Sequence, residues 1–107
     1  MELVERVYEG SSSYPRTEDY ALVTQMRRAA VSVPSNIAEG TARLTKKEFA
    51  TFLRYSSGSL RELDTQLEIA LRVGFMKRSI YDPLKARVDE VGRMLAALIK
   101  SQMGGKV

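Results

Sequence analysis

Residues 45–74 carry the pattern that most constrains the fold. Apolar or small residues recur there at alternating steps of four and three, at Phe49, Leu53, Ser56, Leu60, Leu63, Leu67, Ala70 and Gly74. This spacing places them on one stripe of an α-helix, as in coiled coils. The segment opens with TKKE, in which Thr45 and Glu48 have the spacing of a capping box. We therefore predict one helix over 45–74, about 45 Å long at 1.5 Å per residue.

Helical stripes also run through three other segments, in the last of them at Leu84, Val88, Val91, Leu95, Leu98 and Gln102. No stretch alternates with the period of two that is typical of a β-strand. The sequence therefore predicts an all-α protein with a single domain, whose helices cover about 2–10, 17–40, 45–74 and 80–103. Thr17 is expected to cap the second helix at its start. Gly40 and Gly74 are expected to end the second and third helices.

The first helical segment is much shorter than the others. Residues 1–9 give at most about 15 Å of helix, with an apolar face of Leu3, Val4 and Val7. This face cannot cover a seam about three times as long. Two arrangements remain open: a three-helix bundle with a short helical stub, or a bundle whose uncovered side is buried against other copies of the chain. The second arrangement predicts a homo-oligomer.

The stretch RRAAVSVPSNIAEG at 27–40 places polar side chains within a helical stripe. Proline in a helix interior removes one backbone hydrogen bond, so Pro34 predicts a bend in the second helix and not its end. Asn36 falls at heptad spacing from earlier stripe residues, and a buried amide needs hydrogen-bond partners. One of the two adjacent arginines is expected to pair with Glu39 or Glu62.

The third helix supplies candidate partners for Asn36 in the stretch YSSGSLRELD, namely Ser56, Ser57, Ser59 and Glu62. We predict a polar cluster, the inter-helix lock, that fixes the register of the second and third helices. Its members are Ser32, Asn36, Glu39, Ser57, Ser59 and Glu62. The alternative is that these side chains form a site that faces the surface.

Composition argues against several classes of function. The 107 residues include no cysteine and no histidine, so a disulfide, a thiolate or imidazole metal ligand, and a catalytic cysteine or histidine are all excluded. No phosphate loop of the G-x-x-x-x-G-K-[ST] type occurs. We therefore expect no enzyme activity, no catalytic residues, no cofactor and no metal. No apolar run approaches the roughly 20 residues of a membrane span, and the N-terminus lacks a signal-peptide layout. A cytoplasmic protein without a membrane partner is expected.

The positive charge is concentrated in one third of the chain. Net charge is +4, yet residues 27–61 hold seven basic and two acidic residues, whereas the remainder holds ten basic and eleven acidic ones. Lys47, Arg54 and Arg61 are seven residues apart and form one line on the third helix. Such a line can bind a polyanion, although a solvated helix face has the same pattern. The candidate nucleic-acid contacts are Arg27, Arg28, Arg43, Lys46, Lys47, Arg54 and Arg61.

Two motifs resemble a known family. QMRRAAVSVPSNIAEG at 25–40 and GSLRELDTQLEIA at 58–70 are similar to the small four-helix-bundle proteins encoded in intervening sequences of bacterial 23S ribosomal RNA genes. The same family includes the accessory variability determinant of diversity-generating retroelements. The resemblance is dense over about 14–75 and looser over 76–103.

The resemblance implies an up-down four-helix bundle with a basic surface that assembles as a ring-shaped pentamer. It implies nucleic acid and a reverse transcriptase as partners, because the accessory protein of the retroelements is understood to bind both, and it brings no catalytic residues. The sequence departs from the family at its start, where MELVERVYEG stands in place of a full first helix. A shortened first helix is therefore expected.

Two hypotheses of function follow. The first is a non-enzymatic homo-oligomer that binds structured RNA, DNA or an RNA–protein complex through the basic line, with an affinity that falls as salt rises. The second is an interaction scaffold for a protein such as a reverse transcriptase or another ribonucleoprotein component, with nucleic-acid binding incidental. Charge changes at Lys47, Arg54 and Arg61 distinguish them, because only the first hypothesis predicts that these changes abolish binding.

Overall fold

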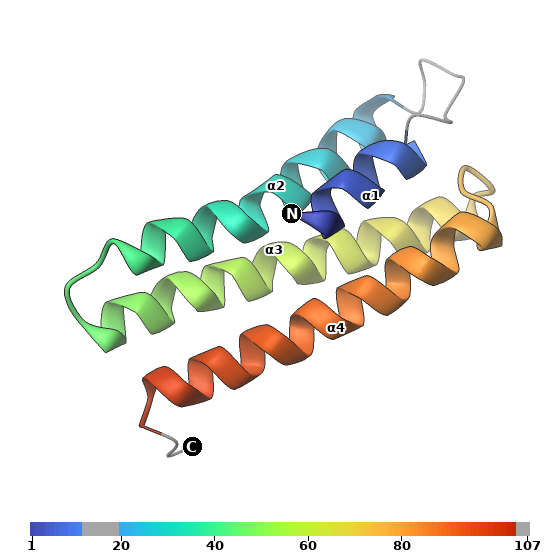
Figure 1. The fold of residues 1–107 in the computed structure, drawn as a ribbon. Coiled ribbons are helices and arrows are strands. Elements are labelled where there is room, and N and C mark those ends of the chain that lie inside the picture. The colour runs from blue at the N-terminus through green and yellow to red at the C-terminus, as the bar shows by residue number, and fades with distance from the viewer. Residues whose placement is uncertain (12–19, 105–107) are drawn as a thin grey trace.

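Four helices and no strand make up the part of the chain that the computed structural model describes, residues 1–11 and 20–104 (Figure 1). They are α1 (Glu2–Ser11), α2 (Tyr20–Thr41), α3 (Lys46–Arg72) and α4 (Arg78–Gln102). The all-α prediction is confirmed, and the cap predicted at Thr17 lies outside the described residues. None of these helices combines the length and the apolarity that crossing a membrane requires.

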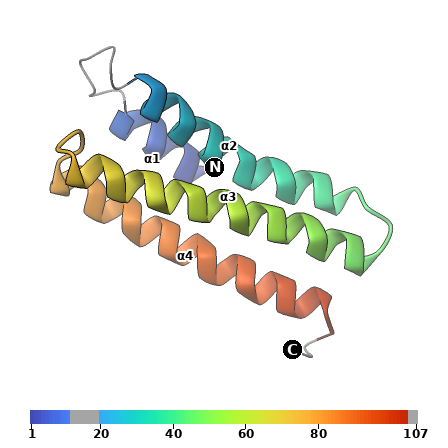
Figure 2. The same cartoon turned by 180° about the vertical axis from the view of Figure 1, so that it is seen from behind.

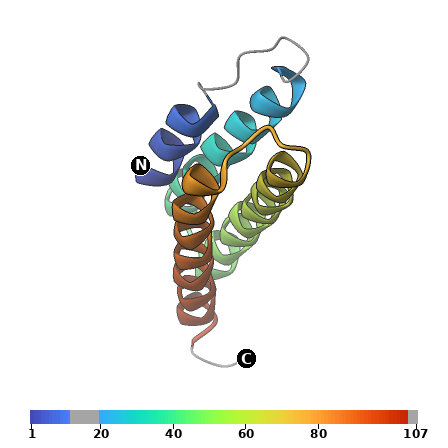
Figure 3. The same ribbon diagram turned by 90° about the vertical axis from the view of Figure 1, so that its right-hand side faces the viewer.

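Each helix runs antiparallel to the next along the chain (Figure 1). The central helix is α3, which packs against α2 on one side and α4 on the other (Figure 2). The short α1 packs against α2 and α4, and within the described residues these two helices make no close backbone contact with each other (Figure 3). Glu2, at the start of α1, pairs with Arg87 near the middle of α4. The later part of α4 therefore extends beyond the reach of α1.

The predicted stripe of α3 forms the centre of the core. Six of its members are buried: Leu53, Ser56, Leu60, Leu63, Leu67 and Ala70. Phe49 is half-buried and packs against the same cluster, together with Met26 and Val33 of α2. Burying one leucine side chain contributes about 1.5–3 kcal/mol. This stripe is thus the main apolar surface that holds α2 and α4 in place.

The stripe of α4 departs from the prediction at its C-terminal end. The first four predicted positions, Leu84 to Leu95, are buried, but Leu98 is 38% exposed and Ile99 packs against the core instead. A straight α-helix drifts by about 20° per heptad from a strict 3.5-residue repeat. In addition, α1 does not extend to this level, so it does not cover Leu98.

Two fully buried side chains, Leu3 and Val7, fix α1 to the bundle. Gly10 allows the end of α1 to approach α4 closely, because a Cβ on Gly10 would lie 3.0 Å from Ile80 Cγ2 and 3.3 Å from Leu84 Cδ1. All three residues of the predicted apolar face, Leu3, Val4 and Val7, therefore pack in or against the core, although the helix is short.

Both ends of α3 show the predicted chemistry. The backbone N–H of Glu48 donates to Thr45 Oγ1 at 3.1 Å, as the capping-box spacing predicts. At the other end, Gly74 has a φ of +83°, and the N–H of Phe75 donates to the carbonyl oxygen of Ala70 at 2.9 Å. This six-residue closure is a Schellman motif, which needs a residue in the left-handed conformation.

Gly40 does not end α2 as predicted. The helix continues to Thr41, and Gly40 is buried without a positive φ. A Cβ there would lie 2.7 Å from Phe49 Cδ1 and 3.0 Å from Phe52 Cβ, so the close approach of α3 requires glycine at this position. The helix also continues through Pro34, in agreement with the prediction that this proline does not end it. The bend at Pro34 stays a prediction.

Replacing Gly40 with alanine is expected to lower the free energy of unfolding by about 1–3 kcal/mol, because the added methyl group overpacks the α2–α3 interface. Gly58 is the matched control, because a Cβ there would meet no atom within 4 Å. In a helix interior, alanine is more stable than glycine by about 1 kcal/mol. Thermal unfolding followed by circular dichroism should show a lower Tm for Gly40→Ala and a higher Tm for Gly58→Ala. A Gly40→Ala variant as stable as the unmodified chain would contradict the close contact with Phe49.

Candidate nucleic-acid interface

Four of the seven predicted nucleic-acid contacts form an exposed row along α3. Lys46 and Lys47 lie in its first turn, and Arg54 and Arg61 follow one and two heptads after Lys47. All four side chains are exposed. Within residues 1–11 and 20–104, none of the four forms an ion pair. We call these four residues the α3 row.

Arg27 does not join the α3 row. Its Nε donates to Ser11 Oγ at 2.9 Å, and its guanidinium lies 4.5 Å from the centroid of the Tyr8 ring. The predicted pairing with Glu39 or Glu62 is therefore wrong for Arg27, which ties α2 to α1 instead. Nothing in the spacing of the sequence indicates this contact, because it depends on how α1 packs against α2.

Arg43 is also engaged elsewhere. It forms an ion pair of 2.6 Å with Glu39, one helical turn earlier, and its guanidinium lies 4.4 Å from the centroid of the Phe52 ring. Arg28 is exposed on α2 and has no ion pair with another described residue, so the predicted pairing with an acid is not found at Arg28 either. Of the seven predicted cations, the α3 row and Arg28 keep a charge that the described part of the chain does not pair.

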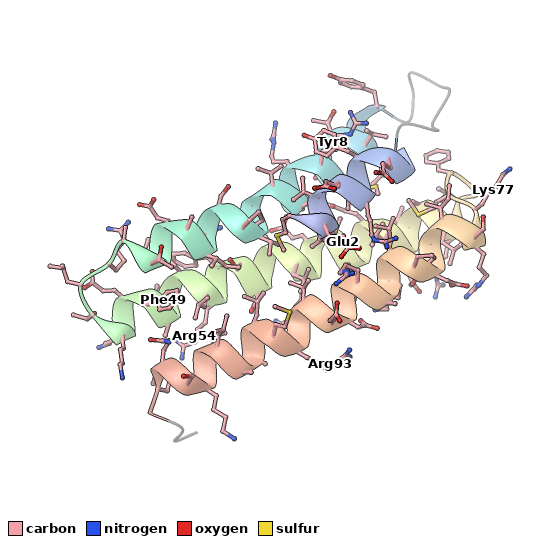
Figure 4. The ribbon with its side chains drawn as sticks, viewed as in Figure 1. Glu2, Tyr8, Phe49, Arg54, Lys77 and Arg93 are labelled. Carbon is pink, nitrogen blue, oxygen red and sulfur yellow. The ribbon has the colours of Figure 1, made fainter. Side chains whose placement is uncertain are left out.

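A groove of about 820 Å³ lies between α3 and α4. Three cations line it: Arg54 and Arg61 from α3, and Arg93 from α4. Figure 4 labels Arg54 on α3 and Arg93 on α4. Apart from two aspartates, the other lining residues are small or apolar: Ser57, Gly58, Leu60, Val88, Gly92, Ala96 and Ile99. Arg93 is not among the predicted contacts, because it lies outside the charge-rich third of the chain. Only the packing of α4 on α3 brings it to this groove.

The two aspartates that line the groove, Asp64 and Asp89, are held by Lys85. Its Nζ lies 2.8 Å from Asp64 Oδ1 and 3.2 Å from Asp89 Oδ1. The hydrogen bond to Asp64 raises the pKa of Lys85 well above its usual range, and Asp89 adds to this effect against the opposing effect of burial. Lys85 therefore stays charged, and the three arginines outweigh the single negative charge that this triad leaves.

The chemistry of the site is that of fixed positive charge. Guanidinium and ammonium groups are hydrogen-bond donors without an acceptor, and arginine is not deprotonated in proteins. Such a surface can hold phosphate or carboxylate groups, and its arginines can hold them by two parallel hydrogen bonds. The arrangement is suited to binding an anion and not to transferring a proton.

Three of the six predicted members of the inter-helix lock are hydrogen-bonded to one another. Asn36 Nδ2 donates to the carbonyl oxygen of Ser32 at 2.9 Å and to its Oγ at 3.0 Å, and Ser59 Oγ lies 2.8 Å from Ser32 Oγ. A second link lies next to them, where the buried Ser56 hydroxyl donates to the carbonyl oxygen of Val33 at 2.7 Å. The bonds of Ser59 and Ser56 connect α3 to α2, whereas both bonds of Asn36 stay within α2, so the partners predicted for Asn36 on the third helix are not found.

The other three predicted members lie outside this cluster. Glu39 pairs with Arg43 at the surface, Ser57 lines the groove between α3 and α4, and Glu62 is exposed. Each residue of an α-helix is rotated by about 100° from the one before it. Ser57 therefore faces away from α2, and its neighbour Ser56 takes the buried position.

Replacing Ser56 with alanine is expected to lower the free energy of unfolding by about 1 kcal/mol, the usual net contribution of one intramolecular hydrogen bond. Ser57→Ala is the matched control, since it makes the same chemical change one residue away, on the side of α3 that faces the groove. Urea unfolding of both variants measures the difference. Equal stability of the two variants would contradict a stabilising role for the bond to Val33.

Comparisons with known proteins give a consistent result. A family model described as "23S rRNA-intervening sequence protein" matches residues 1–97. None of the curated proteins matches the chain. Among solved structures, a crystal structure at 1.70 Å resolution is similar with a TM-score of 0.76 and 18% sequence identity, covering 92% of this chain and 98% of that one. It is a protein with unknown function from the S23 ribosomal protein family of Bacteroides thetaiotaomicron VPI-5482. At this identity the likeness shows the fold alone.

Proposed function

The chain belongs to the 23S rRNA-intervening sequence protein family, and from that premise we propose that it is a non-enzymatic, self-associating cytoplasmic protein that binds nucleic acid. Its ligand would be structured RNA or an RNA–protein complex, held through the α3 row. The family description connects these proteins with ribosomal RNA genes but does not by itself give a ligand. The argument for binding therefore rests on the charges of this chain.

The observation that carries the proposal is the contrast between paired and unpaired cations. Six basic residues of the described chain pair with carboxylates: Arg6, Arg43, Arg72, Arg78, Lys85 and Arg87. The α3 row has no such partner within residues 1–11 and 20–104. Its charge is therefore available to an external polyanion, whereas the paired cations are partly neutralised.

The length of the row suits a nucleic-acid backbone. Lys47 and Arg61 are fourteen residues apart on one helix, which corresponds to about 21 Å of rise. Double-stranded DNA carries one charge per about 1.7 Å of its axis, so a duplex lying along the row presents many phosphates to it. Contacts of this kind are electrostatic and largely independent of sequence.

Self-association is supported by the side of the bundle that α1 leaves uncovered. On α4, Met94 is 58% exposed and Leu98 is 38% exposed, and they lie four residues apart beyond the level of Arg87. Four-residue spacing puts both side chains on one face of the helix. A second copy of the chain could bury this face. Assembly in a ring would repeat the α3 row around an axis and strengthen its field.

The test is fluorescence anisotropy of a labelled RNA hairpin across a salt series. Neutralising the row with Lys47→Gln, Arg54→Gln and Arg61→Gln is expected to weaken binding and to reduce the slope of log affinity against log salt by about 0.9 for each phosphate that the protein no longer neutralises. The matched control is Arg72→Gln, Lys77→Gln and Arg78→Gln, which removes the same charge at the other end of α3 and the start of α4. The control variant should bind nearly as well as the unmodified chain.

Two results would overturn the proposal. An equal decrease in affinity for the two triple variants would show that net charge, and not the α3 row, controls binding. No binding of the unmodified protein at low salt would exclude nucleic acid as a ligand of the protein alone. An interaction scaffold for a protein partner would then be the better explanation.

A further inference from the structure

We infer that the groove between α3 and α4 receives one unpaired nucleotide of the bound RNA, whose phosphate lies among Arg54, Arg61 and Arg93. This inference rests on the proposed function and goes further, because it adds a second site next to the α3 row and names the form of RNA that the site prefers. It also assigns a role to Arg93, which no pattern in the sequence singled out.

Positive charge from two helices lines the groove. Arg54 and Arg61 come from α3 and Arg93 comes from α4, and all three line the same groove. None of them forms an ion pair within the described part of the chain. Unpaired arginines that line one concave site favour an anionic ligand, and the planar donors of a guanidinium group match a phosphate group.

The second observation concerns the two glycines that line the groove, Gly58 and Gly92. A Cβ on Gly58 would meet no atom within 4 Å, and a Cβ on Gly92 would lie at an ordinary distance of 3.5 Å from Leu60 Cδ2. Neither glycine is therefore needed for the packing of α3 against α4, unlike Gly40 in the α2–α3 interface. Glycine in a helix interior is nevertheless less favourable than alanine. What the two glycines provide is open space beside the three arginines.

The size of the groove decides between possible ligands. Its volume of about 820 Å³ falls within the range of about 300–1,000 Å³ that is typical of sites for small molecules. A base with its sugar and phosphate is a ligand of that class, whereas a duplex is too wide to enter and can only lie across the surface. Unpaired bases in loops and bulges are the parts of an RNA that can be turned out, and they stack on aromatic side chains or on arginine planes, of which this groove offers the arginines.

The two ends of the groove differ in charge, and this orients the ligand. Lys85 holds Asp64 and Asp89, and these carboxylates would repel a phosphate placed beside them. Arg54 lies ten residues before Asp64 on α3, whereas Arg61 and Arg93 each lie about one helical turn from an aspartate. Among the three arginines, the phosphate is therefore assigned to the side nearest Arg54.

The experiment uses fluorescence anisotropy to compare two labelled RNA hairpins of equal length, one fully paired and one with a single-nucleotide bulge. In both hairpins a non-nucleotide linker replaces the loop, so that the paired hairpin has no unpaired nucleotide. We expect the protein to bind the bulged hairpin about five-fold more tightly, a difference of about 1 kcal/mol, because the paired hairpin offers the groove no unpaired nucleotide. Gly58→Leu should fill the groove and remove this preference, while binding of the paired hairpin stays unchanged because no charge is altered. Thr65→Leu is the matched control, since Thr65 is exposed on the same helix and does not line the groove.

A second pair of variants tests the phosphate contact. Arg93→Gln is expected to reduce the preference for the bulged hairpin, whereas Arg78→Gln removes the same charge from α4 and should preserve it. Circular dichroism checks that each variant is folded.

The possible failures are distinguishable. If the unmodified protein binds neither hairpin at low salt, the proposed function fails and the groove site fails with it. If it binds both hairpins equally, binding through the α3 row is not contradicted, but the proposed nucleotide site in the groove is wrong. If Gly58→Leu lowers the molar mass measured by light scattering, the groove is a contact between copies of the chain and not a nucleotide site.

Discussion

The buried stripe of α3 is the constraint on which the rest of the structure depends. It is the larger of the two surfaces that α2 and α4 share, the other being the short α1, because within the described residues those two helices have no close contact of their own. Its position on the helix also determines what remains outside. Once Leu53, Leu60 and Leu67 are turned inward, the positions one residue after the first two, Arg54 and Arg61, cannot be buried. The same packing therefore produces both the core and the row of unpaired charge.

Two polar contacts complement this apolar seam at different interfaces. Between α2 and α3, the hydroxyl of Ser56 reaches the backbone of Val33 in the core itself. Between α1 and α2, Arg27 reaches Ser11 and covers the ring of Tyr8. Directional bonds of this kind fix the register of helices whose apolar surfaces alone could slide. The polar residues within the hydrophobic stretch 27–40 are thus largely accounted for by contacts inside the molecule.

Periodicity was sufficient to predict the helices, because a strict pattern over eight positions leaves no other regular structure in which one face is apolar. The capping residues Thr45 and Gly74 were predictable for a similar reason, since their effect is local. What depended on tertiary structure could not be predicted in this way. Gly40 looked like a helix end, but it is a contact with Phe49, which only the packing of α3 shows.

In the candidate site, too, the features that lie on one helix were predictable, and those that depend on the packing of helices were not. The α3 row could be read from heptad spacing, because all of its members lie on one helix. Arg27 could not be assigned correctly, since its partner Tyr8 is brought to it by folding. For Arg43 the four-residue spacing from Glu39 was a signal of the ion pair, whereas its contact with Phe52 depends on folding. Arg93 was missed because two separate helices create its groove. Charge density along the sequence therefore indicates which residues are basic and clustered, but not which of them remain unpaired.

The shortness of α1 has a consequence for how the molecule opens. This helix is held by two fully buried side chains, whereas α3 contributes six buried members of its stripe. Segments with few buried contacts open at a lower free energy than the global unfolding of a protein. Undocking of α1 breaks the bonds from Arg27 and the pair between Glu2 and Arg87 but leaves α2, α3 and α4 in contact. The chain thus has a cooperative unit of three helices and a fourth that can exchange its hydrogen-bonded amides with solvent on its own.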